Sequence, residues 1–219
     1  NPPFEPVIRD GKMYGRGCTD MKGGLMASVM AVKLLQDAGY ELPGDVTITS
    51  VCDEEGGGNG SIQAVMRGLK ADGVVNCEPT DDTLILAHMG WGFFKVDFEG
   101  KACHSGAKAE GVSAIEKAIK VIQGLNEMEH RWLLTIRHRL LPPPSLNIGV
   151  IEGGTAGSTV PGECSFSTCV HYVPTLMNQD MVVKEFTEVV ERISRSDAWM
   201  EAHPPKISIY QTGHGFEME

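Results

Sequence analysis

Four acidic side chains stand out, because each follows a short apolar stretch and could supply a hard oxygen donor. They are Asp20, Glu54, Glu55 and Glu78. Where such stretches are parallel strands, their carboxyl ends meet at one edge of the sheet, which is where ligands bind. Carboxylates grouped in this way suit a divalent cation, while zinc normally takes at least one His as well. None of the seven His residues directly flanks any of the four acids.

Each of these acids also has an ordinary structural interpretation. With 29 Asp and Glu in 219 residues, adjacent pairs such as Glu54-Glu55 arise from composition alone. Asp20 precedes a predicted helix and, taken alone, is better explained as its N-cap. Glu78 fits a solvated loop residue. The glycine-rich stretch 56–60 is not followed by Gly-Lys-Ser/Thr, so we discount a phosphate-binding loop.

The first 90 residues alternate β-branched stretches with helical periodicity. Apolar residues at helical spacing predict a helix through Leu25–Leu34, and Ser61 is predicted to cap a second, short helix. The composition of three further stretches predicts strands at 45–51, 74–75 and 84–86. Strands and helices in this alternation indicate an α/β fold with a mostly parallel sheet.

From residue 91 the pattern changes to strands with one solvated face. Alternating apolar residues predict strands at 94–98, 146–150, 164–172 and 207–209. Ser113 and Glu116 form a capping box that opens one helix, and Asn178 is placed to cap another. The resulting β-α-β-β-α-β order is the ferredoxin-like plan, and about 120 residues suffice for a complete small domain.

Composition limits the classes of partner. The formal charge of −10 and the absence of a basic cluster predict no nucleic acid and no membrane partner. No apolar run approaches the roughly 20 residues of a spanning helix, and no signal peptide is visible in the first residues. The six cysteines form no Cys-x-x-Cys pair or dense framework. We therefore expect a soluble, cytoplasmic protein with reduced thiols.

Four segments resemble, in order and spacing, motifs of the M20 zinc aminoacylase and carboxypeptidase family. They are residues 15–24 (GRGCTDMKGG), 53–56 (DEEG), 76–80 (NCEPT) and 100–106 (GKACHSG). The branch that they most resemble contains acetylornithine deacetylase and succinyl-diaminopimelate desuccinylase. The resemblance implies a partial, zinc-exopeptidase-like catalytic domain at 1–90. It also implies a ferredoxin-like α+β lid for dimerisation at 91–211 and the start of a return to the catalytic domain at 212–219.

The resemblance also implies a role for each acid. Asp20 bridges two zinc ions, while Glu55 and Glu78 are each a terminal ligand of one. Water under two Lewis acids reaches a pKa of about 7 or below. Glu54, next to a ligand but not itself coordinated, then acts as the general base that takes the proton of this water and returns it to the leaving amine. His104 matches a lid histidine that in dimeric members reaches the partner's cleft and helps to hold the oxyanion; taken alone, it is more simply a surface loop residue.

The sequence departs from the family pattern in three ways. No His-x-Asp motif precedes Asp20 and no zinc-binding His follows the lid, since His214 comes too early for that role. Ser158 and His171 stand where related enzymes place a substrate-contacting Asn and Arg, so we predict them as substrate-binding positions of altered specificity. We expect the chain to be an internal part of a longer enzyme, and by itself to bind zinc weakly and to be nearly inactive.

The predicted reaction is metal-dependent hydrolysis of the amide bond of a small N-acyl amino acid or peptide, of the deacetylase, desuccinylase or dipeptidase type. Two Zn²⁺ per complete site are expected, with Co²⁺ or Mn²⁺ as alternative metals. A homodimer through the lid is also expected, because a ferredoxin-like sheet has edge strands that must be paired, covered or blunted. The alternative hypothesis is a non-catalytic dimerisation or binding unit, either a fragment or a pseudoenzyme without the His zinc ligands.

Overall fold

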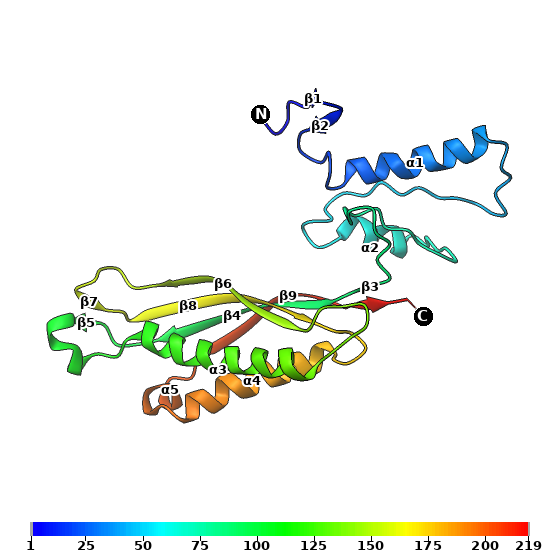
Figure 1. The fold of residues 1–219 in the computed structure, drawn as a ribbon. Helices are drawn as coiled ribbons and strands as arrows, with labels where there is room; N and C mark the ends of the chain where they lie inside the picture. The colour runs from blue at the N-terminus through cyan, green and yellow to red at the C-terminus, as the bar shows by residue number, and fades with distance from the viewer. Residues whose placement is uncertain (1, 219) are drawn as a thin grey trace. The chain divides into compact units, whose positions relative to one another are not determined.

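A computed structural model describes residues 2–218 of the chain, which has an α/β fold, as predicted (Figure 1). The chain divides into two compact units, Asn1–Leu84 and Ile85–Glu219. In the described part of the chain, no helix has the length and apolar character needed to cross a bilayer.

The first unit consists of a hairpin, two helices and long extended segments. In the hairpin, β1 (Val7–Arg9) pairs with β2 (Lys12–Tyr14) around Asp10 and Gly11, whose φ angles are both positive, as tight hairpin turns require. Helix α1 (Lys22–Asp37) confirms the predicted first helix. Helix α2 (Asn59–Met66) begins before Ser61, so the predicted Ser61 cap is wrong. Its N-cap is Gly58, whose φ of 73° is one that glycine adopts without strain.

The strands predicted at 45–51, 74–75 and 84–86 are not formed. None of these stretches forms a strand. Every pair of strands among residues 2–218 is antiparallel, so the expected parallel pairs are absent from the described part of the chain. A strand needs a neighbour for its N–H and C=O groups. The β-branched side chains that suggested burial remain open to solvent: Val46 is 53%, Val74 87% and Val75 84% exposed.

The second unit is built on a four-stranded antiparallel sheet with the order β6-β8-β4-β9. Its strands are β4 (Gly90–Glu99), β6 (Ser145–Gly153), β8 (Glu163–Tyr172) and β9 (Lys206–Gly213). Together with α3 (Ala114–Thr135) and α4 (Gln179–Arg195), they follow in the predicted β-α-β-β-α-β order. This order confirms the ferredoxin-like plan for the second unit.

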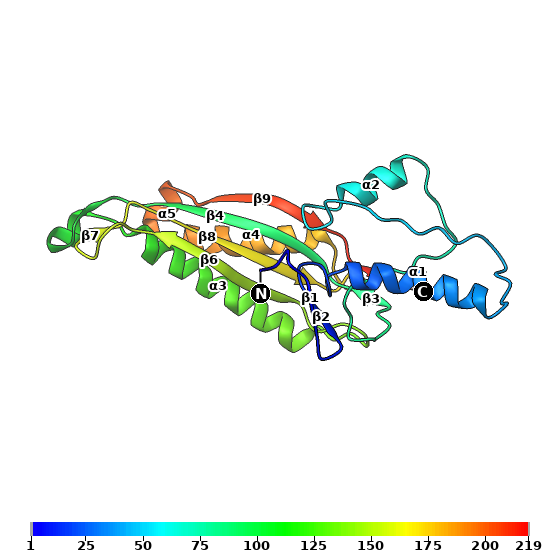
Figure 2. The same cartoon turned by 90° about the horizontal axis from the view of Figure 1, so that it is seen from above.

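Helices α3 and α4 cover one face of this sheet and leave the other face open (Figures 1 and 2). The core between them contains Phe94 of β4, Phe166 of β8 and Phe186 of α4, each at most 1% exposed. The rings of Phe94 and Phe186 stack with centroids 4.4 Å apart. Side chains alternate in burial along β4 and β8, as the sequence predicts for strands with one solvated face.

Side-chain caps fix the starts of both long helices. Ser113 Oγ accepts from the backbone N–H of Glu116 at 3.2 Å, and Asn178 Oδ1 accepts from that of Met181 at 2.8 Å, as predicted. Short elements complete the unit: β3 (Ala87–His88), β5 (Cys103–His104), the 3₁₀ helix η1 (Ser105–Glu110), β7 (Thr159–Val160), α5 (Ala198–Ala202) and β10 (Phe216–Glu217). Strand β10 pairs with β3, and β5 pairs with β7.

Candidate active site

Three of the four predicted acids lie near the fourth, Glu78, in the first unit. Burial raises the pKa of Glu78, and the negative charges of Glu54 and Asp20, a side-chain hydrogen bond with Asp20 and the charge of Glu55 raise it further. Glu78 is half-buried, whereas the other three are exposed. Asp20, Glu54 and Glu55 therefore lie close enough to Glu78 for their charges to act on it.

A glycine explains how Asp20 and Glu78 come so close. Gly24 in the first turn of α1 lies against the backbone of Cys77, so closely that an added Cβ would be 2.2 Å from the Cys77 carbonyl oxygen. Only a residue without a side chain permits this approach. Asp20 is not the N-cap of α1, because that position belongs to Met21 and carries no side-chain cap. The interpretation of Asp20 as the cap of this helix is therefore wrong.

A tight turn presents Glu54 and Glu55. Asp53 takes a left-handed conformation with a φ of 63°, and its carbonyl accepts from the Gly58 N–H at 2.9 Å. The Asn59 side-chain amide donates to the Asp53 carboxylate and ties the two ends of the turn together. The sequence analysis did not predict the contact between Asn59 and Asp53. The sequence features that could have indicated it are a third acid directly before Glu54 and an amide side chain within the glycine-rich stretch.

The donor chemistry fits the carboxylate part of a divalent-cation site. The negative charges near Glu78 disfavour its ionised form, a nearby cation would relieve that repulsion, and carboxylate oxygens are hard ligands. Among residues 2–218, no three or more His, Cys, Asp and Glu side chains are already arranged as a metal site. Imidazole, which zinc normally takes, is not among the donors in this cluster.

His104 and Ser158 lie together in the second unit. Residue His104 of β5 pairs with Thr159 of β7, and the Ser105 N–H donates to the Ser158 carbonyl at 2.9 Å. The exposed His104 imidazole accepts from the Gly106 N–H at Nδ1, over 3.1 Å. The proton of a neutral His104 is therefore on Nε2, where it can be donated to a ligand.

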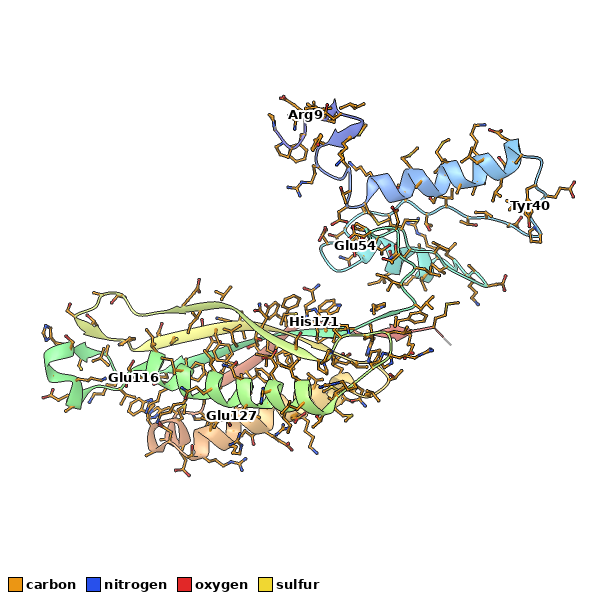
Figure 3. All side chains as sticks on the ribbon, viewed as in Figure 1. Arg9, Tyr40, Glu54, Glu116, Glu127 and His171 are labelled. Atoms are coloured by element: carbon orange, nitrogen blue, oxygen red, sulfur yellow. The ribbon has the colours of Figure 1, made fainter. Side chains whose placement is uncertain are left out.

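His171 lies elsewhere, towards the opposite end of β8. It lies eight residue steps along the extended strand from Glu163, which is about 27 Å at the usual rise per residue. The β5–β7 pair lies beyond the Glu163 end of β8, since Gly100 N–H donates to the Gly162 carbonyl there. Figure 3 shows His171 on the sheet face turned away from α3 and α4. One copy of the unit thus groups His104 with Ser158 but not with His171.

The chain belongs to the peptidase family M20/M25/M40, whose model matches residues 1–213. Among relatives, it is 35% identical over 215 residues to N-formyl-4-amino-5-aminomethyl-2-methylpyrimidine deformylase of Bacillus subtilis, covering 93% of this chain and 50% of that protein. It is 33% identical over 164 residues to acetylornithine deacetylase of Myxococcus xanthus, covering 72% and 41%. The chain thus spans about half the length of the curated relatives that it matches.

A probable succinyl-diaminopimelate desuccinylase of Staphylococcus aureus is 28% identical over 216 residues, with 88% of this chain and 53% of that protein covered. The predicted resemblance to the deacetylase and desuccinylase branch is therefore confirmed, although the deformylase was not foreseen. Among solved structures, a tripeptidase of Staphylococcus aureus matches with a TM-score of 0.72 at 20% identity, over 98% of this chain and 55% of that one. This likeness confirms the fold.

Proposed function

We propose that the chain carries the carboxylate part of the active site of a metal-dependent amidohydrolase, which cleaves the amide bond of a small N-acyl amino acid or related compound. The proposal rests on the gathering of Asp20, Glu54 and Glu55 around Glu78. Membership of the peptidase family supports it. So do relatives named for removing formyl, acetyl or succinyl groups.

In this proposal Asp20, Glu55 and Glu78 would hold two Zn²⁺, or Co²⁺ or Mn²⁺ in their place. When bound, the cations supply Lewis acidity towards water and the amide carbonyl. Glu54 takes the proton of the attacking water and returns it to the leaving amine. The Nε2–H of His104 donates to the oxyanion that develops on the carbonyl.

Metal titration of the 219-residue chain tests the division of roles. We expect weak Zn²⁺ or Mn²⁺ binding, and a loss of at least about tenfold in affinity for Glu55→Gln and Glu78→Gln, since each removes a ligand. Glu54→Gln removes the same charge but no ligand, so it is the matched control and is expected to change affinity much less. Equal losses in all three variants would mean that the cluster attracts cations by charge alone.

We propose further that the protein is a homodimer through its second unit, with His104 acting in the partner's site. Strand β6 is an edge of the sheet, and its Val150 and Ile151 are each 51% exposed. An edge of this kind offers unpaired backbone groups to a second copy. The separation of His104 from His171 within one copy supports the trans assignment.

Mixing two inactive variants of the full-length protein tests action in trans. In a heterodimer of Glu54→Gln with His104→Ala, one site keeps its own Glu54 and receives an intact His104 from the other chain. We expect activity to return to about half of the sites in such heterodimers. No recovery despite verified subunit exchange would show that His104 serves its own chain.

A further inference from the structure

Three aromatic side chains form a contiguous shelf on the open face of the four-stranded sheet. Trp91 and Phe93 of β4 meet edge to face with centroids 5.5 Å apart, and Phe93 stacks on Tyr210 of β9 at 5.6 Å. Tyr210 is 58% exposed, and the other two are partly exposed. Because α3 and α4 cover the opposite face (Figure 1), this aromatic shelf has no part in the core of the unit.

Polar groups stand beside the aromatic shelf. The strand register places His171 directly opposite Trp91 and Cys169 opposite Phe93. In the described part of the chain, the only polar side-chain contact of the His171 imidazole is the Cys169 thiol, with Sγ 3.9 Å from each ring nitrogen. A thiol at that distance is a weak partner. The imidazole therefore retains hydrogen-bonding capacity for a ligand on the shelf.

The backbone next to the shelf is shaped to hold the indole. Gly213 of β9 lies opposite Trp91, and an added Cβ would come within 2.4 Å of the indole Cε2. A side chain at this position would push the ring away from β9. The glycine thus lets the indole lie over the neighbouring strand and keeps its outer side accessible.

The shelf is small and has a polar boundary. The next residues of β4 on this face are Lys95 and Asp97, which form an ion pair at 2.7 Å, and Ser167 and Ser165 lie opposite them on β8. Three rings, of about 150–250 Å² each before they cover one another, offer less than the roughly 800 Å² per partner in a stable protein interface. The dimensions suit one flat ring.

We infer that the shelf binds the planar aromatic or heteroaromatic ring of a small molecule, with a polar substituent held by His171. Stacking on Phe93 and Tyr210 supplies the preference for a flat ring, since aromatic pairs gain more than apolar area alone. The inference rests on the proposed function only in taking this molecule to be an amide substrate. Binding itself needs neither metal nor turnover, so this inference and the proposed function can fail separately.

The test compares two amides that differ only in ring flatness, N-benzylformamide and N-(cyclohexylmethyl)formamide. Each is titrated into the 219-residue chain with a chelator present, and binding is followed by saturation-transfer NMR. We expect the benzyl compound to bind about three- to tenfold more tightly, with transfer strongest at its ring protons. Equal affinities, or no transfer to the ring, would refute the inference.

Single substitutions test whether the ring of the amide binds at the aromatic shelf. Tyr210→Leu and Phe93→Leu should reduce the preference for the benzyl compound to within about twofold, while His171→Ala should weaken both amides and keep the preference. Tyr40→Leu, which removes an exposed aromatic ring of the first unit, is the matched control and should change nothing. Tyr210 is the safer site, because its exposed side chain contributes little to folding.

Two further outcomes would overturn the assignment. A preference that survives in Tyr210→Leu would place the ring elsewhere. Self-association that Phe93→Leu abolishes in sedimentation velocity would show that a second copy of the chain covers this face.

Discussion

The acids predicted to act in catalysis lie in the first unit, whereas the buried core lies in the second. The first unit holds the acids around Glu78, yet none of its described residues is buried, and both of its helices are open to solvent along their length. The second unit packs α3 and α4 on a sheet with Phe94, Phe166 and Phe186 almost wholly excluded from water. The candidate metal ligands therefore belong to a unit that gains little stability from its own burial, while the second unit has a complete core.

The strongest test of this contrast separates the units. Residues 85–219 expressed alone should fold and unfold cooperatively, with a Tm within about 5 °C of the main transition of the whole chain, because their core is self-contained. Residues 1–84 alone should show no cooperative transition. Thermal unfolding by circular dichroism measures both. Cooperative unfolding of the first segment, or an unfolded second segment, would remove the contrast.

A pair of identical substitutions tests the contrast at single residues. Phe186→Ala removes a ring that is 0% exposed and stacked on Phe94, and should lower the free energy of unfolding by about 3–5 kcal/mol. Phe4→Ala removes a ring that is 82% exposed in the first unit and should change it by less than about 0.5 kcal/mol. Urea unfolding measures both. A similar loss in the two variants would mean that the first unit has a core comparable to the second.

The same contrast explains which elements the sequence could predict. The caps at Ser113 and Asn178 and the alternation along β4 and β8 were predicted correctly, because the cap is a local interaction and the strands find their partners within the same unit. The stretch 45–51 has equally strong β-branched character but no partner among the described residues, so it forms no strand. Propensity specifies a strand only when a neighbour supplies the hydrogen bonds.

The candidate site shows a similar limit. The four acids were singled out because each follows an apolar stretch and lies in a motif that resembles a known family, but the parallel strands expected to bring them together are not formed. The separation of His171 from His104 and Ser158 could not be predicted, since it depends on the length of β8 and the position of the β5–β7 pair. Likewise, the link between Asn59 and Asp53 appears only once the glycine-rich turn is folded.

The second unit also contains a buried ionic link that should make its stability sensitive to acid. Asp197 is 6% exposed; its carboxylate accepts from Lys117 at 2.8 Å and Lys120 at 2.6 Å, and also from the backbone N–H of Met200. Burial alone would raise the pKa of Asp197, but hydrogen bonds from Lys117, Lys120 and Met200 outweigh it and hold the pKa well below its usual range. The carboxylate thereby joins α3 to the start of α5.

Because folding lowers this pKa, the stabilisation is complete above the unfolded-state value of about 3.9 and is lost as the pH falls from there towards the folded-state value. Asp197→Asn should therefore cost about 3 kcal/mol at pH 7 and much less near pH 2. Denaturant unfolding of both proteins across this pH range measures the difference. A loss that does not depend on pH would assign the effect to packing. Glu191→Gln, which alters an exposed ion pair with Arg195, is the control and should cost less than about 0.5 kcal/mol.

The smallest expected effect comes from a flaw in the otherwise well-packed core. Thr168 of β8 is 1% exposed, and its hydroxyl oxygen has no hydrogen-bond partner among the described residues. A buried hydroxyl without a partner loses its hydration and gains nothing in return. Thr168→Val keeps the shape and the β-branched backbone preference, so it should raise the free energy of unfolding by about 1 kcal/mol.

Thr168→Ser is the control, because it keeps the hydroxyl and removes a methyl group, and it should destabilise the unit. Destabilisation by Val would show that the hydroxyl is satisfied in solution and that the core of the second unit has no such flaw.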